Sequence, residues 1–119
     1  MIPTEWRTVH RDEDDELLGF LAPAGDTPGL VTPMTVFGYP LGAAQPDTDA
    51  LRVLASTGLS YLAERWTLTL AAHPDPISVQ IVEASPDRLT LQSVDYGHPL
   101  GYGTRFELPT PVDHRLALG

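Results

Sequence analysis

Two glutamates, Glu64 and Glu83, are the residues of this 119-residue sequence whose type and placement come closest to a catalytic pair. If the strands that carry them fold back symmetrically about a turn at residues 73–76, the two carboxylates lie directly opposite each other on an apolar face. Opposed carboxylates repel each other, and desolvation then raises the pKa of one of them. Acid–base catalysts and metal sites use such pairs. The alternative is that the sheet ends there, with both side chains in water or beside Arg7 or Arg52.

Five consecutive acids, Asp12 to Glu16, raise the question of a cation site. A calcium loop of the EF-hand kind needs Gly at its sixth position and Glu at its twelfth. Counted from Asp12, these positions hold Leu17 and Pro23, so the pattern fails. We interpret the run as a solvated hairpin turn with Arg11 and Glu16 as a weak surface pair. A weak cation site or a contact for a basic partner is the alternative.

A glycine-rich stretch, residues 95–106, carries Tyr96, His98 and Tyr102 between glycines 97, 101 and 103. Aromatic side chains on such a loop are suited to lining a pocket or contacting a partner. A phosphate-binding glycine motif opens a helix, whereas the residues that follow here have a strand pattern. An ordinary long hairpin loop is the alternative interpretation.

Several kinds of chemistry are excluded by composition. The sequence contains neither Cys nor Lys, which removes disulfides, thiolate chemistry, Schiff-base lysines and the Walker phosphate loop. No serine has a nucleophile-elbow context. Because the histidines lack metal-ligand spacing on any one element, we expect neither a metal nor a cofactor. These histidines are His10, His73, His98 and His114.

The net charge of −9, with seven scattered arginines, argues against nucleic acids and anionic membranes as partners. The hydrophobic content of 42% is enough for a folded core. The sequence has no apolar run long enough to cross a membrane and no recognisable secretion signal, so we expect a cytoplasmic protein. The joint absence of Lys and Asn predicts a GC-rich bacterial genome, and a salt-adapted source is the alternative.

The first half of the chain is predicted to contain a hairpin, a broken strand and a helix. Residues 5–11 and 16–22 form the hairpin, with Trp6 opposite Leu21. Residues 30–39 are strand-like, but Pro33 restricts them to an edge or a broken strand. Residues 50–56 suit a short helix, and Leu51 and Leu54 would share its buried stripe. Asp49 is its predicted N-cap and Gly58 its predicted C-terminal residue.

The second half alternates apolar and polar residues in four segments, which predicts an antiparallel meander. The predicted register pairs Leu68 with Val79 and Trp66 with Ile81, and then Ile81 with Leu91. Residues 60–66 also suit a helix. We expect the helix and the first strands to cover the apolar face. The polar face, which should contact solvent, contains Arg65, Gln80, Thr90 and Arg105.

The predicted fold class is therefore α+β, mainly an antiparallel, meander-like sheet of about six or seven strands with one short α-helix on its apolar face. A β-barrel or a sandwich is the alternative. Residues 1–119 form one domain, and residues 109–119, after Pro109, are a candidate tail. This tail either packs back on the core or reaches another subunit.

No motif has catalytic spacing, so the sequence favours a small, acidic, non-catalytic binding or accessory protein with a protein or small-molecule partner. Its predicted binding residues are Trp66, Tyr96, His98 and Tyr102. The alternative is an enzyme or small-molecule-binding protein with a pocket under the sheet, using Glu64 and Glu83 with Trp66 as a wall. A further alternative is an acidic mimic of nucleic acid.

Overall fold

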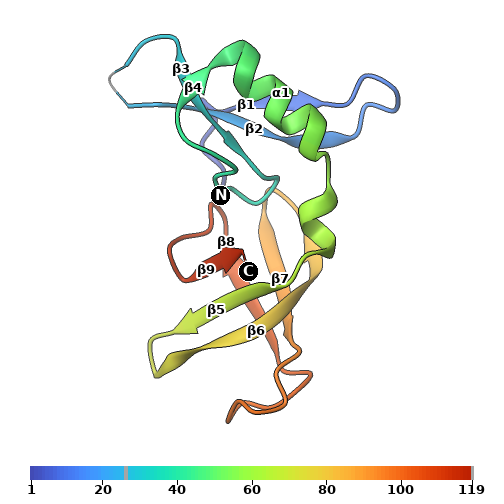
Figure 1. Cartoon of the computed structure of the whole chain (residues 1–119), viewed down its shortest axis with the longest axis vertical. Coiled ribbons are helices and arrows are strands. Elements are labelled where there is room, and N and C mark those ends of the chain that lie inside the picture. Colours follow the sequence, from blue (N-terminus) through green and yellow to red (C-terminus); the bar gives the residue numbers. More distant parts are fainter. Residues whose placement is uncertain (26, 119) are drawn as a thin grey trace.

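The computed structural model describes residues 1–25 and 27–118 of the chain, without the side chain of His73. These residues form two antiparallel sheets, one α-helix and one short 3₁₀ helix (Figure 1). The first sheet has the order β1-β2-β3-β4, and its strands are β1 (Arg7–His10), β2 (Leu17–Pro23), β3 (Leu30–Met34) and β4 (Gln45–Pro46). The helices α1 (Asp47–Thr57) and η1 (Ser60–Ala63) follow.

The second sheet has the order β8-β7-β6-β5-β9. Its strands are β5 (Trp66–Leu70), β6 (His73–Ala84), β7 (Arg88–Ser93), β8 (Arg105–Pro109) and β9 (Leu116–Leu118). The predicted α+β class is thus confirmed, with two sheets in place of one. Neither sheet closes into a barrel within the residues described. The two sheets lie at opposite ends of a molecule measuring 45 × 33 × 22 Å (Figure 1).

The β1–β2 hairpin has the predicted turn but not the whole predicted register. The backbone N–H of Arg11 donates to the carbonyl of Glu16 at 2.8 Å, as expected. A β-bulge then shifts the pairing by one residue, so that Arg7 rather than Trp6 lies opposite Leu21. A bulge of this kind places one extra residue on one strand, which a symmetric fold about the turn does not allow for.

Pro33 lies in β3, and the structure shows how the strand accommodates it. The neighbouring β4 pairs only with Leu30 and Val31, at the other end of β3. Pro33 pairs with Leu21 of β2 on one side and has passed the end of β4 on the other. Beyond the end of β4 the carbonyl of Pro33 accepts the N–H of Leu41 at 2.8 Å, and a position that needs no N–H donor for a strand ladder on that side suits proline.

Helix α1 starts three residues earlier than predicted, at Asp47, with Pro46 rather than Asp49 as its N-cap, and it ends as predicted before Gly58. Gly58 has φ +56°, a left-handed conformation that glycine adopts without strain, and its N–H donates to the carbonyl of Leu54. The early start places Asp47 and Asp49 in the first turn, where their charge interacts favourably with the helix dipole.

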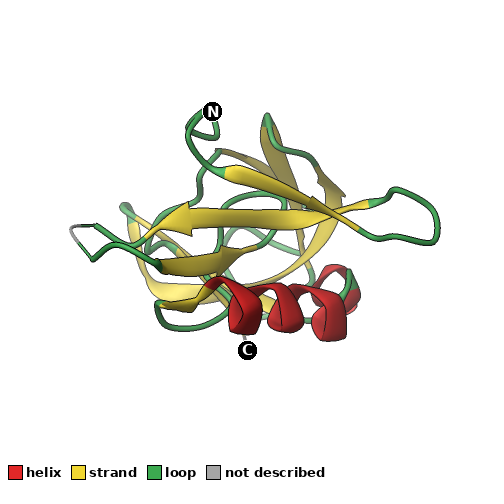
Figure 2. Ribbon diagram, turned by 90° about the horizontal axis from the view of Figure 1, so that it is seen from above, coloured by secondary structure: helices red, strands yellow, loops and turns green. Residues whose placement is uncertain are grey.

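The buried stripe of α1 differs from the prediction. Ala50 and Leu54, four residues apart, are both fully buried, whereas Leu51 is 42% exposed. The helix packs on β2 and β3 of the first sheet and runs along one side of it (Figure 2). The prediction that α1 covers the apolar face of the meander is therefore wrong, because α1 packs on the first sheet instead.

The β5–β6 pair is shifted by two residues from the predicted register. Trp66 pairs with Val79, and Leu68 pairs with Ile77. The cause lies in the turn, because β6 already begins at His73 and the expected turn residues form an irregular part of this strand. Prolines are tolerated at such irregularities because they have no N–H for the ladder.

A two-residue shift leaves each side chain on its predicted face, because side chains alternate with period two. The later pairing of Ile81 with Leu91 is confirmed. On the polar face, Arg65, Gln80 and Arg105 are exposed as expected, whereas Thr90 is buried.

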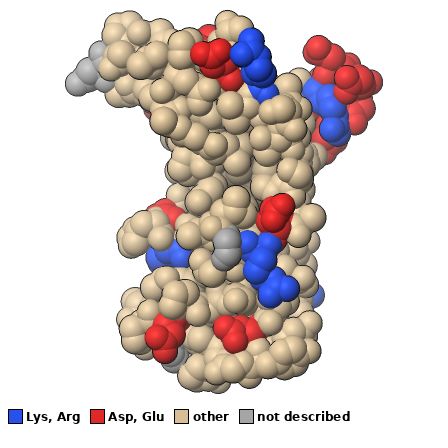
Figure 3. All heavy atoms as spheres, viewed as in Figure 1, with Lys and Arg blue, Asp and Glu red and all other residues tan. Residues whose placement is uncertain are grey.

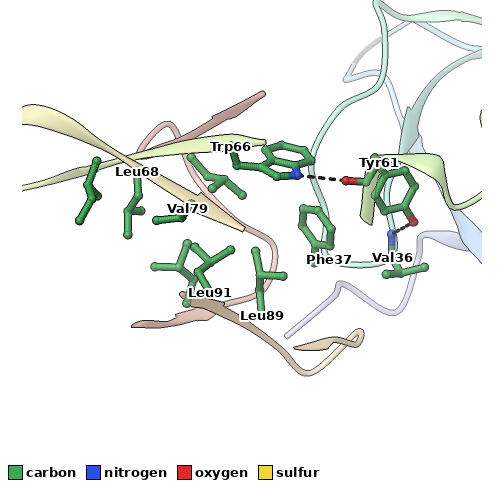
Figure 4. Packing of buried hydrophobic residues seen from close by; sticks show 11 residues of the cluster. Val36, Phe37, Tyr61, Trp66, Leu68, Val79, Leu89 and Leu91 are labelled. Carbon is green, nitrogen blue, oxygen red and sulfur yellow. Dashed lines mark hydrogen bonds between the residues drawn. The ribbon is translucent and has the colours of Figure 1, made fainter. Parts of the chain in front are cut away.

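The two sheets meet in a cluster of aromatic side chains (Figure 4). The ring of Phe37, which is fully buried, packs edge-on against Tyr61 at 5.7 Å and Trp66 at 5.6 Å between ring centres. The hydroxyl of Tyr61 donates to the carbonyl of Leu18 and accepts the N–H of Val36, each at 3.2 Å. The loop after β3 thus covers the apolar face of the meander, and η1 holds that loop through Tyr61.

The candidate tail returns to the second sheet. Leu116 is buried, and β9 pairs with β5 in antiparallel orientation. Val112 packs against the core cluster, and its N–H donates to the carbonyl of Phe37. Of the two alternatives for the candidate tail, the structure shows that residues 109–118 pack back on the core.

Candidate functional site

The proposed glutamate pair is not assembled. Residues 60–63 form η1 rather than a strand, and Glu64 is the residue that caps this helix. Glu83 pairs with Thr90 of β7, and both glutamate side chains are exposed. Because the register is shifted and β5 begins only at Trp66, the geometry that would oppose and desolvate the two carboxylates is absent from the described residues.

Trp66 belongs to the core rather than to a pocket wall. Its side chain is fully buried, and its indole N–H donates to the carbonyl of Tyr61 at 3.0 Å. The ring of Tyr39 packs against it edge-on, with 4.8 Å between ring centres. The pocket expected beneath the sheet, with Trp66 as its wall, is therefore filled by aromatic side chains (Figure 4).

The two loop tyrosines, in contrast, are brought together. The rings of Tyr96 and Tyr102 are stacked, with centres 4.5 Å apart and planes 10° apart. Tyr96 is 84% exposed and Tyr102 51% exposed, which leaves most of this double ring in solvent. The loop lies at the end of the molecule farthest from α1 (Figure 1). The sequence identified these two residues but gave no reason to expect that their rings stack.

The base of this loop is held by hydrogen bonds from Asp95 and His98. The carboxylate of Asp95 accepts the N–H groups of Gly97 at 3.0 Å and Ser78 at 3.4 Å. His98 is 8% exposed; its Nδ1 accepts the N–H of Leu100, and its carbonyl accepts that of Gly101. His98 therefore supports the loop from inside, and its buried ring is not part of the exposed aromatic surface.

The acidic turn between β1 and β2 is ordered by one of its five acids. Asp14 accepts hydrogen bonds from the guanidinium of Arg11 at 3.1 and 3.2 Å and from the N–H of Glu16. The hydrogen bond from Arg11 is the main cause that lowers the pKa of the Asp14 carboxyl. The turn thus agrees with the predicted solvated hairpin tip, but the partner of Arg11 is Asp14 rather than Glu16.

A groove of about 400 Å³ lies between this turn and α1. The sequence analysis did not identify it, because its walls come from segments that are far apart in the chain. The groove is open to solvent, and its lining consists of Val9, His10, Arg11, Asp12, Glu13, Leu18, Leu51 and Ala55. The sequence carried no clear signal of it, because Leu51 was predicted to be buried with Leu54, whereas the structure leaves it off the stripe of Ala50 and Leu54.

The other perturbed ionisable groups have structural explanations. Hydrogen bonding to Arg115 lowers the pKa of Asp113 near the tail, and burial raises the pKa of Tyr61 in the core. Within the described part of the chain, no three His, Asp or Glu side chains are grouped to hold a metal ion. The side chain of His73 lies outside the described residues. The helices that the structure describes are too short or too polar to span a bilayer.

Comparisons with protein-family models, with curated proteins and with solved structures found no match for this chain.

Proposed function

We propose that this protein is a non-catalytic binding or accessory module that recognises a partner protein through the stacked pair of Tyr96 and Tyr102. The observation that carries the proposal is the exposed, ordered double ring, whose members are 84% and 51% exposed. Tyrosine is enriched in protein interfaces because its ring contributes apolar area and its hydroxyl a hydrogen bond.

The hydrogen bonds beneath the loop support this proposal energetically. Asp95 and His98 hold the backbone on either side of Tyr96, so much of the ordering has taken place before binding. A surface that is ordered in advance loses less conformational entropy on association. The exposed faces of the two rings suit a partner that presents Arg, Pro or another flat side chain.

The alternative of an enzyme receives less support. Its candidate acids, Glu64 and Glu83, are both exposed, and its proposed wall, Trp66, is in the core. The alternative of a nucleic-acid mimic needs a continuous acidic face. On the face shown in Figure 3, acidic side chains form separate groups that alternate with basic ones.

We also propose that the protein is cytoplasmic and comes from a bacterium with a GC-rich genome. The absence of Lys and Asn from the sequence supports the GC-rich genome. The absence of Cys, which makes disulfides impossible, fits the cytoplasm.

The test is affinity capture from such a bacterium with the full chain as bait, followed by calorimetry with the purified partner. Replacing both rings, Tyr96→Ala with Tyr102→Ala, should weaken binding about 10- to 100-fold, since buried interface tyrosines are typical hot spots. The matched control is Val82→Ala, which removes another exposed apolar side chain from the same sheet, 41% exposed on β6.

The control should bind within about twofold of the wild-type chain. A partner that binds the double tyrosine variant as tightly as it binds the wild type would contradict the proposed surface. Turnover of a small molecule that depends on Glu64 or Glu83 would instead support the enzyme alternative.

A further inference from the structure

The groove between the β1–β2 turn and α1 has an apolar floor. Leu18 is 3% exposed and Val9 is half-buried, so both contribute apolar surface from the hairpin. Leu51 and Ala55, four residues apart on α1, form the opposite wall, and Leu51 is 42% exposed. Leu54, three residues later on the same helix, is completely buried. Leu51 is therefore a large apolar side chain that the rest of the protein covers only in part.

One rim of the groove is acidic. Asp12 and Glu13 line it, and both side chains are exposed. The turn that carries them has five acids against one arginine, which gives it four net negative charges. Arg11 also lines the groove, and its Nε lies 3.1 Å from a carboxylate oxygen of Asp14 and 3.9 Å from one of Glu13. It therefore offsets one of the five negative charges, and four remain.

The order of the turn fixes the rim relative to the floor. The N–H of Asp15 donates to the carbonyl of Arg11, and the N–H of Arg11 donates to that of Glu16, each at 2.8 Å. Asp15 adopts φ +59°, a left-handed conformation that Asp tolerates better than most residues. The turn projects at the end of the first sheet beside α1, where Figure 3 shows a dense group of charged side chains.

From this arrangement we propose that the groove binds a basic amphipathic segment of a partner protein. One or two of its large apolar side chains contact Val9, Leu18 and Leu51, and its Lys or Arg side chains lie beside Asp12 and Glu13. Charge complementarity selects this occupant, because four negative charges repel nucleic acid and anionic lipid. A helix that lays its apolar face in a groove is an established mode of peptide recognition. This surface is separate from the tyrosine loop, so the proposal does not depend on the proposed function.

The experiment uses the full, ¹⁵N-labelled chain and two synthetic peptides. The probe is an amphipathic peptide of about 15 residues made of Leu, Ala and Lys, and its control has Glu in place of every Lys. The Lys peptide should shift the amide signals of Val9 to Glu13 and of Leu51 to Ala55, whereas the Glu peptide should not. Raising the salt from about 50 mM to about 500 mM should weaken binding by screening the rim.

Two variants separate the floor from the rim. Leu51→Ser should weaken the Lys peptide about tenfold at all salt concentrations, because the contact it removes is apolar. The double variant Asp12→Asn with Glu13→Gln should weaken it about three- to tenfold at low salt and have little effect at high salt. All of these side chains are exposed, so circular dichroism should show a folded chain in each case.

Each variant has a matched control elsewhere on the chain. The control for Leu51→Ser is Val82→Ser, which removes a similarly exposed apolar side chain. The control for the double acid variant is Glu64→Gln with Glu83→Gln, which also removes two negative charges but at exposed sites outside the groove. Both controls should stay within about twofold of wild type. The proposal is overturned if the controls weaken binding as much as the groove variants do. It is also overturned if the Glu peptide or phosphatidylglycerol vesicles bind equally well, or if the shifted amides lie outside the groove.

Discussion

The two sheets of this protein bury their apolar faces to different extents. Among the described residues, the second sheet shares a core cluster of eleven buried residues with the loop after β3 and with η1. The cluster under the first sheet has four buried residues: Leu21 and Val31 from strands, and Ala50 and Leu54 from α1. The second sheet is thus covered by the rest of the chain, whereas the first is covered mainly by one helix.

This difference accounts for the apolar groove that stays open beside α1. Phe37, Tyr61 and Trp66 fill the space above the meander, so a ligand has no room there. A single helix of eleven residues cannot cover a four-stranded sheet to the same extent, and the groove beside Leu51 remains open. The uneven core therefore leaves an open apolar groove beside the first sheet, whereas the corresponding space above the second sheet is filled.

The largest effect should come from removing the ring that joins the two halves. Phe37→Ala should lower the free energy of unfolding by about 3–5 kcal/mol, because the ring is fully buried between two aromatic neighbours. Urea unfolding followed by Trp66 fluorescence in a Trp6→Phe background measures it. If the variant is too unstable, Phe37→Leu should still fold, with a loss of about 1–2 kcal/mol.

The matched control for that measurement is Phe106→Ala on β8. Its ring is only half-buried, so its loss should cost roughly half as much. If Phe37→Ala lowers the free energy of unfolding no more than Phe106→Ala does, the contact between the two halves contributes little to stability. The proposed contrast between the two sheets would then be wrong.

A smaller effect distinguishes the two faces of α1. Leu54→Ala should lower the free energy of unfolding by about 2–4 kcal/mol, because Leu54 is fully buried against the first sheet. Leu51→Ala, three residues earlier on the same helix, should change it by about 0.5 kcal/mol or less, since Leu51 is 42% exposed. Urea titrations of the two variants side by side provide the measurement. Equal losses would mean that Leu51 is covered and that the groove is closed in solution.

The same pair of leucines shows what the sequence could not reveal about the helix. Gly58 marked its end correctly because a left-handed C-terminal residue is a local property. The buried face depends on the surface against which the helix packs. Ala50 carries little hydrophobic signal, so the true stripe of Ala50 and Leu54 was less apparent in the sequence than Leu51 and Leu54.

In the meander, the alternation predicted which side chains point inward, because that property survives a shift of two residues. The register itself depended on Pro74 and Pro76, which suggested a turn but lie within β6. The proposed pair of Glu64 and Glu83 depended on that register and was lost with it. The prediction of the tyrosine loop did not depend on the register, because its two tyrosines are close in sequence. The groove could not be predicted, because its shape depends on how the β1–β2 hairpin packs against α1.

The smallest effect concerns a feature that both regions share, an exposed Asp–Arg pair. Hydrogen bonding to arginine lowers the pKa of Asp14 in the first hairpin and of Asp113 before β9. Each carboxyl therefore stabilises the fold above its unfolded pKa of about 3.9, and this stabilisation is lost as the pH falls through the lower, folded pKa. Asp14→Asn and Asp113→Asn should each lower the urea midpoint slightly at pH 7 and converge with wild type in acid.

Solvent screening keeps both of these effects small, whichever sheet carries the pair. Urea midpoints measured from about pH 7 down to about pH 2 test this, with Asp12→Asn as a control. Asp12 forms no ion pair with any described residue, so its removal should change the urea midpoint little at pH 7. A large loss from Asp14→Asn alone would mean that the acidic turn stabilises the first sheet. The weaker core of that sheet would then depend on charge as well as on apolar burial, and the contrast between the two regions would be one of chemistry as well as of coverage.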